Sequence, residues 1–306
     1  MDLKKLENKL DNLKRIEQKV NNDKNILLID IMKQNRLLSF YVKNARHNKN
    51  MILALRNEYS FKSLLVSKDD YPFKSLAIIK KIRNLFIKPK ELWIYLTEEQ
   101  KYATDSYSRY ENNILTNTKK VNADFITIGK RAAEFCKLNN LNIIYEIDNS
   151  DIYSDLSWRL CQIIKFLFAQ ENYESLHFVI NSNKNINGNF TILPVNEFNI
   201  DILRESSYES EDINIKSFKI FPNIDQYISS QINSFIENSV QSLLVESSFY
   251  KSKIGLVSTN KIINELDDEM KKIGKKIIRI KRENEIEEIV LLTSNNKKFL
   301  TRGDNN

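Results

Sequence analysis

The last long segment of the chain, residues 223–290, places the strongest constraint on what this sequence can fold into. From Leu256 its apolar side chains recur at alternating steps of three and four residues, the spacing that turns one face of a helix toward a partner helix. The series is Leu256, Thr259, Ile263, Leu266, Met270, Ile273, Ile277 and Ile280, in which only Thr259 is polar. No proline follows Pro222, and Asn223 with Gln226 three residues later is a helix-start pattern. The segment therefore predicts one long helix that needs a second long helix beside it.

The start of the chain can supply that second helix. The first proline is Pro72 and the first glycine is Gly129, so nothing in residues 2–57 forces a break. A strict seven-residue repeat places nine apolar residues at twelve positions: Leu3, Leu6, Leu10, Leu13, Glu17, Val20, Lys24, Leu27, Ile31, Gln34, Leu38 and Tyr41. At about 1.5 Å per residue this makes a rod of roughly 80 Å. We expect a coiled coil of the two ends; periodicity leaves its polarity open, and antiparallel pairing is natural for one chain.

The middle of the chain changes to alternating short elements. Strands are expected at 91–96, 123–128, 141–147, 176–180 and 189–195, with helices near 107–115, at 130–138 and from 154 onward. Strands that alternate with helices are typical of a mostly parallel sheet covered by helices. The predicted fold class is α/β, with a Rossmann-like domain inserted into a long antiparallel coiled coil. The predicted division is an N-terminal helix at 1–57, an α/β domain at 58–222, and a C-terminal helix and tail at 223–306.

Positive charge is concentrated in the predicted rod. Residues 1–57 hold thirteen basic and six acidic side chains, and residues 251–282 hold ten basic and four acidic ones. A solvated, lysine-rich face is one interpretation, and an acidic partner around the rod is the other, nucleic acid among the candidates. The chain has no apolar run near the roughly 20 residues of a membrane span, and no signal peptide is recognisable. Cys136 and Cys161 lie among helix-period apolar residues, so we expect buried thiols and a reducing, cytoplasmic compartment.

The sequence argues against a catalytic activity in this chain. Gly129 is the only glycine before Gly188, so neither of the glycine-rich loops that cradle nucleotide phosphates can be present in that part. His47 and His177, with two buried cysteines, do not form a metal-ligand pattern. We therefore expect no catalytic residues, no metal and no cofactor, and a protein that is not an enzyme by itself.

Several segments, taken together, resemble the gamma subunit, or central stalk, of F-type rotary ATPases. Residues 285–290 (EIEEIV) are similar to the closing E-[LI]-x-E-I-V motif of that family, and residues 243–247 (LLVES) to its L-x-E-S segment. Residues 128–131 (IGKR) with Phe135 resemble a turn-and-helix motif, residues 192–194 (ILP) a strand end, and residues 6–20 the opening helix. The chain departs from the family at 97–102 (TEEQKY), where a glycine-containing signature is usual, and at Ile278–Arg279. The resemblance covers nearly the whole chain and indicates a diverged F-type-like paralogue, such as those of wall-less bacteria.

The resemblance implies a non-catalytic rotor that couples ATP hydrolysis or synthesis in a catalytic hexamer to rotation, with gliding motility or ion transport as the work done. The implied partners are an alpha/beta-like hexamer and a subunit or membrane sector at the stalk foot, with no nucleic acid. The implied location is the cytoplasm, peripheral to the inner face of the cell membrane. The partner-binding residues would be Lys271, Lys272, Lys275, Lys276, Arg279, Arg282, Glu285 and Glu288. The alternatives are a coiled-coil scaffold or adaptor with an α/β head, and a nucleic-acid-binding rod, which the scarcity of interleaved aromatics disfavours.

Overall fold

The computed structural model describes residues 3–61, 63, 65–67, 90–98, 106–119, 121–148, 156–170, 173–203 and 213–302, with only the backbone for residues 294–302. The chain forms two compact units. The first, called here the helical unit, comprises Met1–Ile29 and Ile254–Asn306. The second, called the α/β unit, comprises Asp30–Lys253. The three-part division expected from the sequence remains a prediction, and Ser154, the expected start of a helix, lies outside the described residues.

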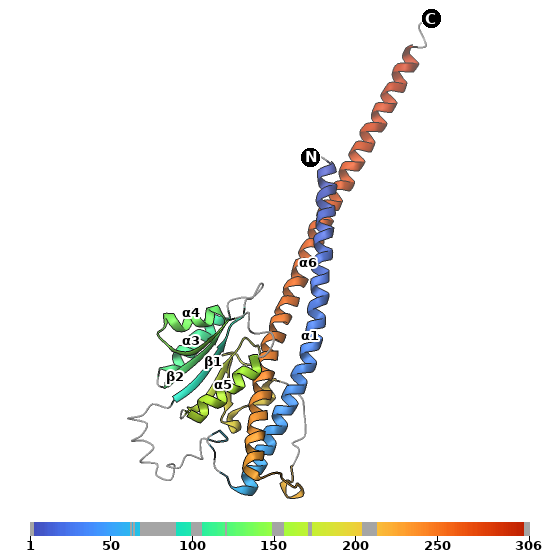
Figure 1. Ribbon diagram of the computed structural model, residues 1–306. Helices are drawn as coiled ribbons and strands as arrows, with labels where there is room; N and C mark the ends of the chain where they lie inside the picture. The colour runs from blue at the N-terminus through green and yellow to red at the C-terminus, as the bar shows by residue number, and fades with distance from the viewer. Residues whose placement is uncertain are drawn as a thin grey trace. The chain divides into compact units, whose positions relative to one another are not determined.

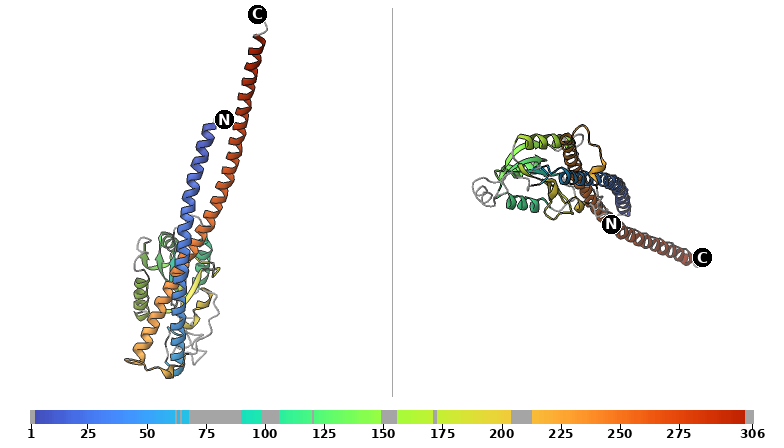
Figure 2. Two further views of the ribbon diagram at one scale, coloured as in Figure 1. Left: turned by 90° about the vertical axis from the view of Figure 1, so that its right-hand side faces the viewer. Right: turned by 90° about the horizontal axis from the view of Figure 1, so that it is seen from below.

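Two long helices supply the helical unit: α1 (Leu3–Tyr59) and α6 (Ile224–Arg302). In this unit they lie side by side and run in opposite directions (Figure 1, Figure 2). Ion pairs fix the direction, because Glu7 meets Lys281 at 2.9 Å whereas Lys9, further along α1, meets Glu269 at 2.7 Å. The apolar seam between the helices consists of Leu3, Leu6, Leu10, Leu13, Leu266, Met270, Ile273, Ile277 and Ile280. These are positions of the predicted repeat; whether the two helices supercoil stays a prediction.

The two glycines of α6 occupy different surroundings. The low helix propensity of glycine predicts a close approach of a second helix at Gly255 and Gly274. At Gly255 an added Cβ would lie 3.3 Å from Cδ1 and Cδ2 of Leu27, so the close approach is present. At Gly274 an added Cβ would meet nothing within 4 Å, so the prediction is wrong there. Gly274 adjoins the buried Ile273 but turns away from α1.

The α/β unit contains a mixed sheet of five strands in the order β3-β2-β1-β4-β5. The strands are β1 (Lys90–Leu96), β2 (Asn122–Ile128), β3 (Asn142–Ile147), β4 (Tyr173–Val179) and β5 (Asn189–Leu193). β1, β2, β3 and β4 are mutually parallel, and β5 is antiparallel to β4. All five strands lie where the sequence places them, although β4 begins at Tyr173 rather than at Leu176.

Alternating side chains of the strands fill two cores. One face of the sheet carries Trp93, Tyr95 and Phe125 beneath the helices α3 (Tyr107–Thr118) and α4 (Lys130–Leu138). The other face carries Leu92, Ile94 and Leu96 and packs on α5 (Leu156–Gln170) and on the parts of α1 and α6 that belong to this unit. Figure 1 shows the labelled helices on the two sides of the sheet. Both cysteines are buried, as the sequence predicts, and burial raises the pKa of each thiol to about 12.

Short connections complete the α/β unit. Single turns of 3₁₀-helix follow β5 at Val195–Glu197 and Ile200–Leu203, and a third lies at Ile215–Ser217. α6 then begins where the sequence predicts, because the side-chain oxygen Oδ1 of Asn223 accepts a hydrogen bond of 2.8 Å from the backbone N–H of Gln226. At the other predicted turn, Gly129 precedes α4 with φ of 95°, a conformation that favours glycine.

Candidate partner-binding surface

The eight sequence-predicted contact residues are all exposed on α6 in the helical unit. They are Lys271, Lys272, Lys275, Lys276, Arg279, Arg282, Glu285 and Glu288. The buried Ile273 and Ile277 lie among them and face α1. At 100° per residue, Lys271, Lys275 and Arg282 fall on the side of α6 opposite the seam, and Lys272, Lys276 and Arg279 fall on one flank. The structure thus groups the six basic residues into two neighbouring stripes along one stretch of helix.

Ion pairs leave most of this basic surface available. Arg279 Nε lies 2.8 Å from Glu283 Oε1 one turn later, in an exposed pair. The hydrogen bond to Glu283 raises the pKa of the Arg279 guanidinium, a group that is charged in proteins without this help. Solvent screens exposed pairs of this kind, so the pair with Glu283 holds Arg279 only weakly in place.

On the C-terminal side of the basic stripes, the described side chains of α6 form no packed face. Every side chain from Lys281 to Thr293 is exposed. Ile286, Ile289 and Val290 are each exposed by about 60% although they are apolar, and they fall one turn apart on the same side of the helix. Acidic Glu285 and Glu287 border this stripe on its two sides, and Glu288 lies on the opposite side of the helix. A contiguous exposed apolar stripe rimmed by charge is typical of a contact surface for another protein.

A second polar feature lies at the start of the strands in the α/β unit. Asp124 is 3% exposed and accepts hydrogen bonds from Tyr173 Oη at 2.6 Å and Asn142 Nδ2 at 2.7 Å. Lys90 Nζ approaches the same carboxylate to 3.0 Å. Burial alone would raise the pKa of Asp124, but these partners together hold it below its ordinary value. The group is fully satisfied, and we interpret it as structural.

A third polar group lies at the opposite ends of β1 and β4. Glu246 of α6 is 1% exposed and accepts a hydrogen bond of 2.6 Å from Ser182 Oγ. Tyr110 Oη of α3 donates to Asn181 Oδ1 at 3.1 Å. The sequence does not mark Asp124 or Glu246 as a site, because each finds its partners 18 to 64 residues away along the chain. An acidic residue inside an apolar run, as in residues 243–247, is the one signal that sequence offers.

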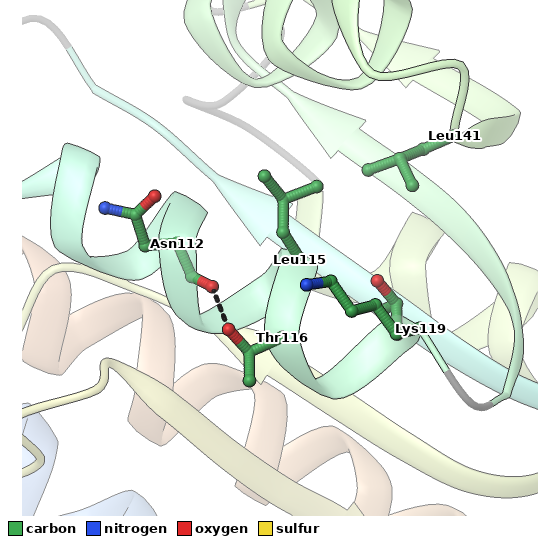
Figure 3. A pocket seen from close by; sticks show the side chains of 6 residues that line it. Asn112, Leu115, Thr116, Lys119 and Leu141 are labelled. Carbon is green, nitrogen blue, oxygen red and sulfur yellow. Dashed lines mark hydrogen bonds between the residues drawn. The ribbon is translucent and has the colours of Figure 1, made fainter.

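Two further polar features of the described residues are the surroundings of His177, whose Nε2 also lies 3.5 Å from Glu91 Oε2, and a hollow beside α3. His177 stacks on Trp93 with ring centroids 4.4 Å apart and lies between Ser175 Oγ and Thr191 Oγ1 on neighbouring strand positions. The described residues contain no cluster of three potential metal ligands, and none of their helices is both long and apolar enough to span a membrane. A hollow beside the end of α3 is lined by Asn112, Leu115, Thr116, Thr118, Lys119 and Leu141 (Figure 3). Its Thr116 hydroxyl donates to the backbone oxygen of Asn112 at 2.8 Å, and the hollow holds no buried charge that would select a ligand.

Comparison with solved structures finds chains of mitochondrial ATP synthases, at low similarity. Two come from Euglena gracilis: one in a rotor structure (TM-score 0.41, 11% identity, 92% of this chain and 98% of that chain) and one in an OSCP/F1/c-ring structure (0.42, 12%, 99% and 96%). A third comes from the central stalk and c-ring structure of Tetrahymena thermophila (0.38, 12%, 75% and 98%). At these scores the likeness does not by itself define fold or function. No protein-family model matches the chain.

The fold and the exposed surface define an α/β protein whose long first and last helices pair with each other. Sequence comparison then gives a family. The chain is 47% identical over 297 residues to "Uncharacterized protein UU050" of Ureaplasma parvum serovar 3, which covers 97% of this chain and 95% of that protein. The chain belongs to the same family as that Ureaplasma protein.

Proposed function

We propose that this protein is the non-catalytic central rotor, a gamma-like subunit, of an F-type-like rotary ATPase. The observation that carries the proposal is the antiparallel pairing of the first and last helices, which joins Glu7 to Lys281 and Lys9 to Glu269 around an apolar seam. A rotor needs a stiff element, and two paired helices without an internal proline provide one. The sequence segments that resemble the gamma family, from residues 6–20 to 285–290, support the same assignment.

The basic stripes of α6 are proposed to contact the catalytic hexamer. Acidic loops of the catalytic subunits would attract Lys271, Lys272, Lys275, Lys276, Arg279 and Arg282, and the exposed stripe with Glu285 and Glu288 would continue the contact. Each pair between exposed side chains would be weak by itself, because water and salt screen it. Several pairs that form and break in sequence would therefore be needed to transmit torque.

The proposal extends to activity and location. The chain would not hydrolyse ATP by itself, and the hexamer would carry the chemistry in either direction, synthesis or hydrolysis. The α/β unit would face a stalk-foot subunit or membrane sector, which would hold the complex at the inner face of the cell membrane without a span contributed by the described helices. Within this class, the missing glycine signature at 97–102 and the altered residues at 278–279 favour a specialised motor, of the gliding type, over a housekeeping synthase.

Native purification tests the proposal. The tagged chain, isolated from its own cells in mild detergent, is expected to bring down two larger P-loop proteins, each in molar excess over it, and ATPase activity that the isolated chain lacks. A parallel purification with an unrelated tagged cytoplasmic protein is the control. Recovery of the chain without any P-loop subunit would contradict the rotor assignment and favour a scaffold or adaptor.

A further inference from the structure

The order of strands in the α/β unit marks one edge of its sheet. From β1 the chain passes through α3 to β2 and on to β3 on one side, and then returns through α5 to β4 on the other side of β1. The carboxyl ends of β1 and β4 are therefore the point at which the order reverses. In open α/β sheets this switch point is where a ligand binds, because the diverging connections leave a crevice there.

Side chains of the same chain occupy the switch point. Tyr110 Oη donates to Asn181 Oδ1 at 3.1 Å and to the backbone oxygen of Ser182 at 3.3 Å. The ring of Tyr110 lies on Gly188, where an added Cβ would come within 2.8 Å of the ring carbons. Tyr107 Oη, also from α3, accepts a hydrogen bond of 3.0 Å from the backbone N–H of Glu98 at the end of β1. The crevice is thus filled by tyrosines of α3.

On the remaining side of the crevice, α6 contributes the carboxyl group of Glu246. Ser182 Oγ donates to Glu246 Oε1 at 2.6 Å and itself accepts from the backbone N–H of Lys184 at 3.0 Å. Glu246 Oε2 and Asn181 Nδ2 are both buried, and neither has a hydrogen-bond partner among the described residues. One turn beyond, Lys251 Nζ pairs with Glu98 at 3.2 Å. Glu246 is therefore buried with only half of its carboxyl group satisfied, which favours the uncharged form over the charged one.

We propose that the side chain of Glu246 fills the switch point and holds α6 against the sheet edge more strongly when its carboxyl group carries a proton. This pH-dependent contact lies within the α/β unit, so the proposal stands whether or not the chain is a rotor. In the neutral form the half-satisfied carboxyl group is tolerated in the buried edge. In the ionised form the buried carboxylate has lost hydration that its hydrogen bond from Ser182 does not fully replace, so the packing of α6 on this edge is weakened.

The surrounding charges agree with this direction. Burial raises the pKa of Glu246, while the Ser182 hydrogen bond and the positive charges of Lys184 and Lys253 oppose the shift without cancelling it. Tyr250 follows Glu246 by one turn of α6 and interacts with Tyr110, and burial likewise raises the pKa of Tyr250. Because the pKa of Glu246 is higher in the folded than in the unfolded protein, its contribution to stability is complete below the unfolded value of about 4.3 and is lost as the pH rises through the folded value.

Paired unfolding measurements test whether the contribution of Glu246 to stability depends on pH. Urea unfolding of the full chain and of E246Q, a variant of the same shape that cannot ionise, is followed from pH 4 to pH 8. The ratio of the unfolding constant of the wild type to that of E246Q is expected to rise with pH across this range. E237Q, which removes an exposed carboxylate from the same helix, is the matched control and is expected to give a constant ratio.

A second measurement does not depend on the folding of a variant. The side-chain carboxyl carbon of Glu246, followed by NMR in the wild type, is expected to titrate above the ordinary range for glutamate. S182A removes the donor that favours the ionised form, so it is expected to move this midpoint to still higher pH. A midpoint at the ordinary value, or a wild-type to E246Q ratio that does not change with pH, would overturn the proposal.

Discussion

Asp124 of β2 shows how one residue can join its own strand to three others. Its carboxylate accepts hydrogen bonds from β3 (Asn142) and β4 (Tyr173) and lies 3.0 Å from Lys90 at the start of β1. The ammonium of Lys90 also lies 4.9 Å from the centre of the Tyr173 ring. The three partners come from elements that meet only in the folded sheet, so the group stabilises the assembled sheet rather than any single strand.

Replacing Asp124 by asparagine is expected to lower the free energy of unfolding by about 2 kcal/mol at pH 7, because the buried hydrogen bonds lose their charged acceptor. Since the pKa of Asp124 is lower in the folded protein, its contribution is present above the unfolded value of about 3.9 and is lost as the pH falls through the folded value. Unfolding by urea should therefore show wild type and D124N converging in acid. D148N, at an exposed aspartate after β3, is the control, with an expected change under about 0.5 kcal/mol.

At the scale of elements, the periodicity of apolar residues predicts where the strands and helices lie but not which distant residues come into contact. The strands and α4 lie within a few residues of their predicted positions, because alternating or helical burial leaves a local pattern along the chain. What cannot be predicted locally is which residue finds a distant partner. Ser182 and Glu246 are 64 residues apart, and their contact follows from the sheet order, which no single segment encodes. The same limit explains Gly274, whose surroundings depend on how α6 is rotated about its axis.

The two glycines of α6 form a matched pair for a stability test. G274A is expected to raise the free energy of unfolding by about 0.5–1 kcal/mol, because alanine favours helix and the added methyl group meets nothing within 4 Å. G255A gains the same propensity but must displace the side-chain end of Leu27 at 3.3 Å, so its gain is expected to be smaller. Thermal unfolding followed by circular dichroism measures both. A larger gain for G255A than for G274A would contradict the close approach of α1 and α6 at Leu27.

At the scale of the whole molecule, charge is distributed unequally between its parts. The exposed basic residues from Lys271 to Arg282 follow one another along a helix whose opposite face is sealed by an apolar seam. Within this stretch Arg279 pairs with Glu283 and Lys281 with Glu7, and the other basic side chains are exposed on the helix surface. Reversing the exposed charges should leave folding intact, so any effect on the proposed complex would be an effect on contacts between subunits.

The triple variant K272E, K275E and R279E is expected to reduce the ATPase turnover of the assembled complex by about tenfold. The three substitutions would turn three attractive contacts with acidic groups into repulsive ones at once, and their combined effect on the transition state sets the size of the expected change. The circular dichroism spectrum is expected to remain unchanged. K119E, K130E and K219E make the same charge change at exposed positions of the α/β unit and should leave turnover near that of the wild type. Unchanged turnover in the first triple variant would remove these side chains from the contact.

Rotation itself tests the central claim most directly. Cys136 and Cys161 are buried, so a cysteine introduced at Leu138, which is 83% exposed, can be labelled selectively in the native complex. With the catalytic subunits fixed to a surface, a probe on this residue is expected to turn in one direction when ATP is added and to stop when ATP is removed. A probe that stays still while the complex hydrolyses ATP would contradict the proposal that this chain is the rotor.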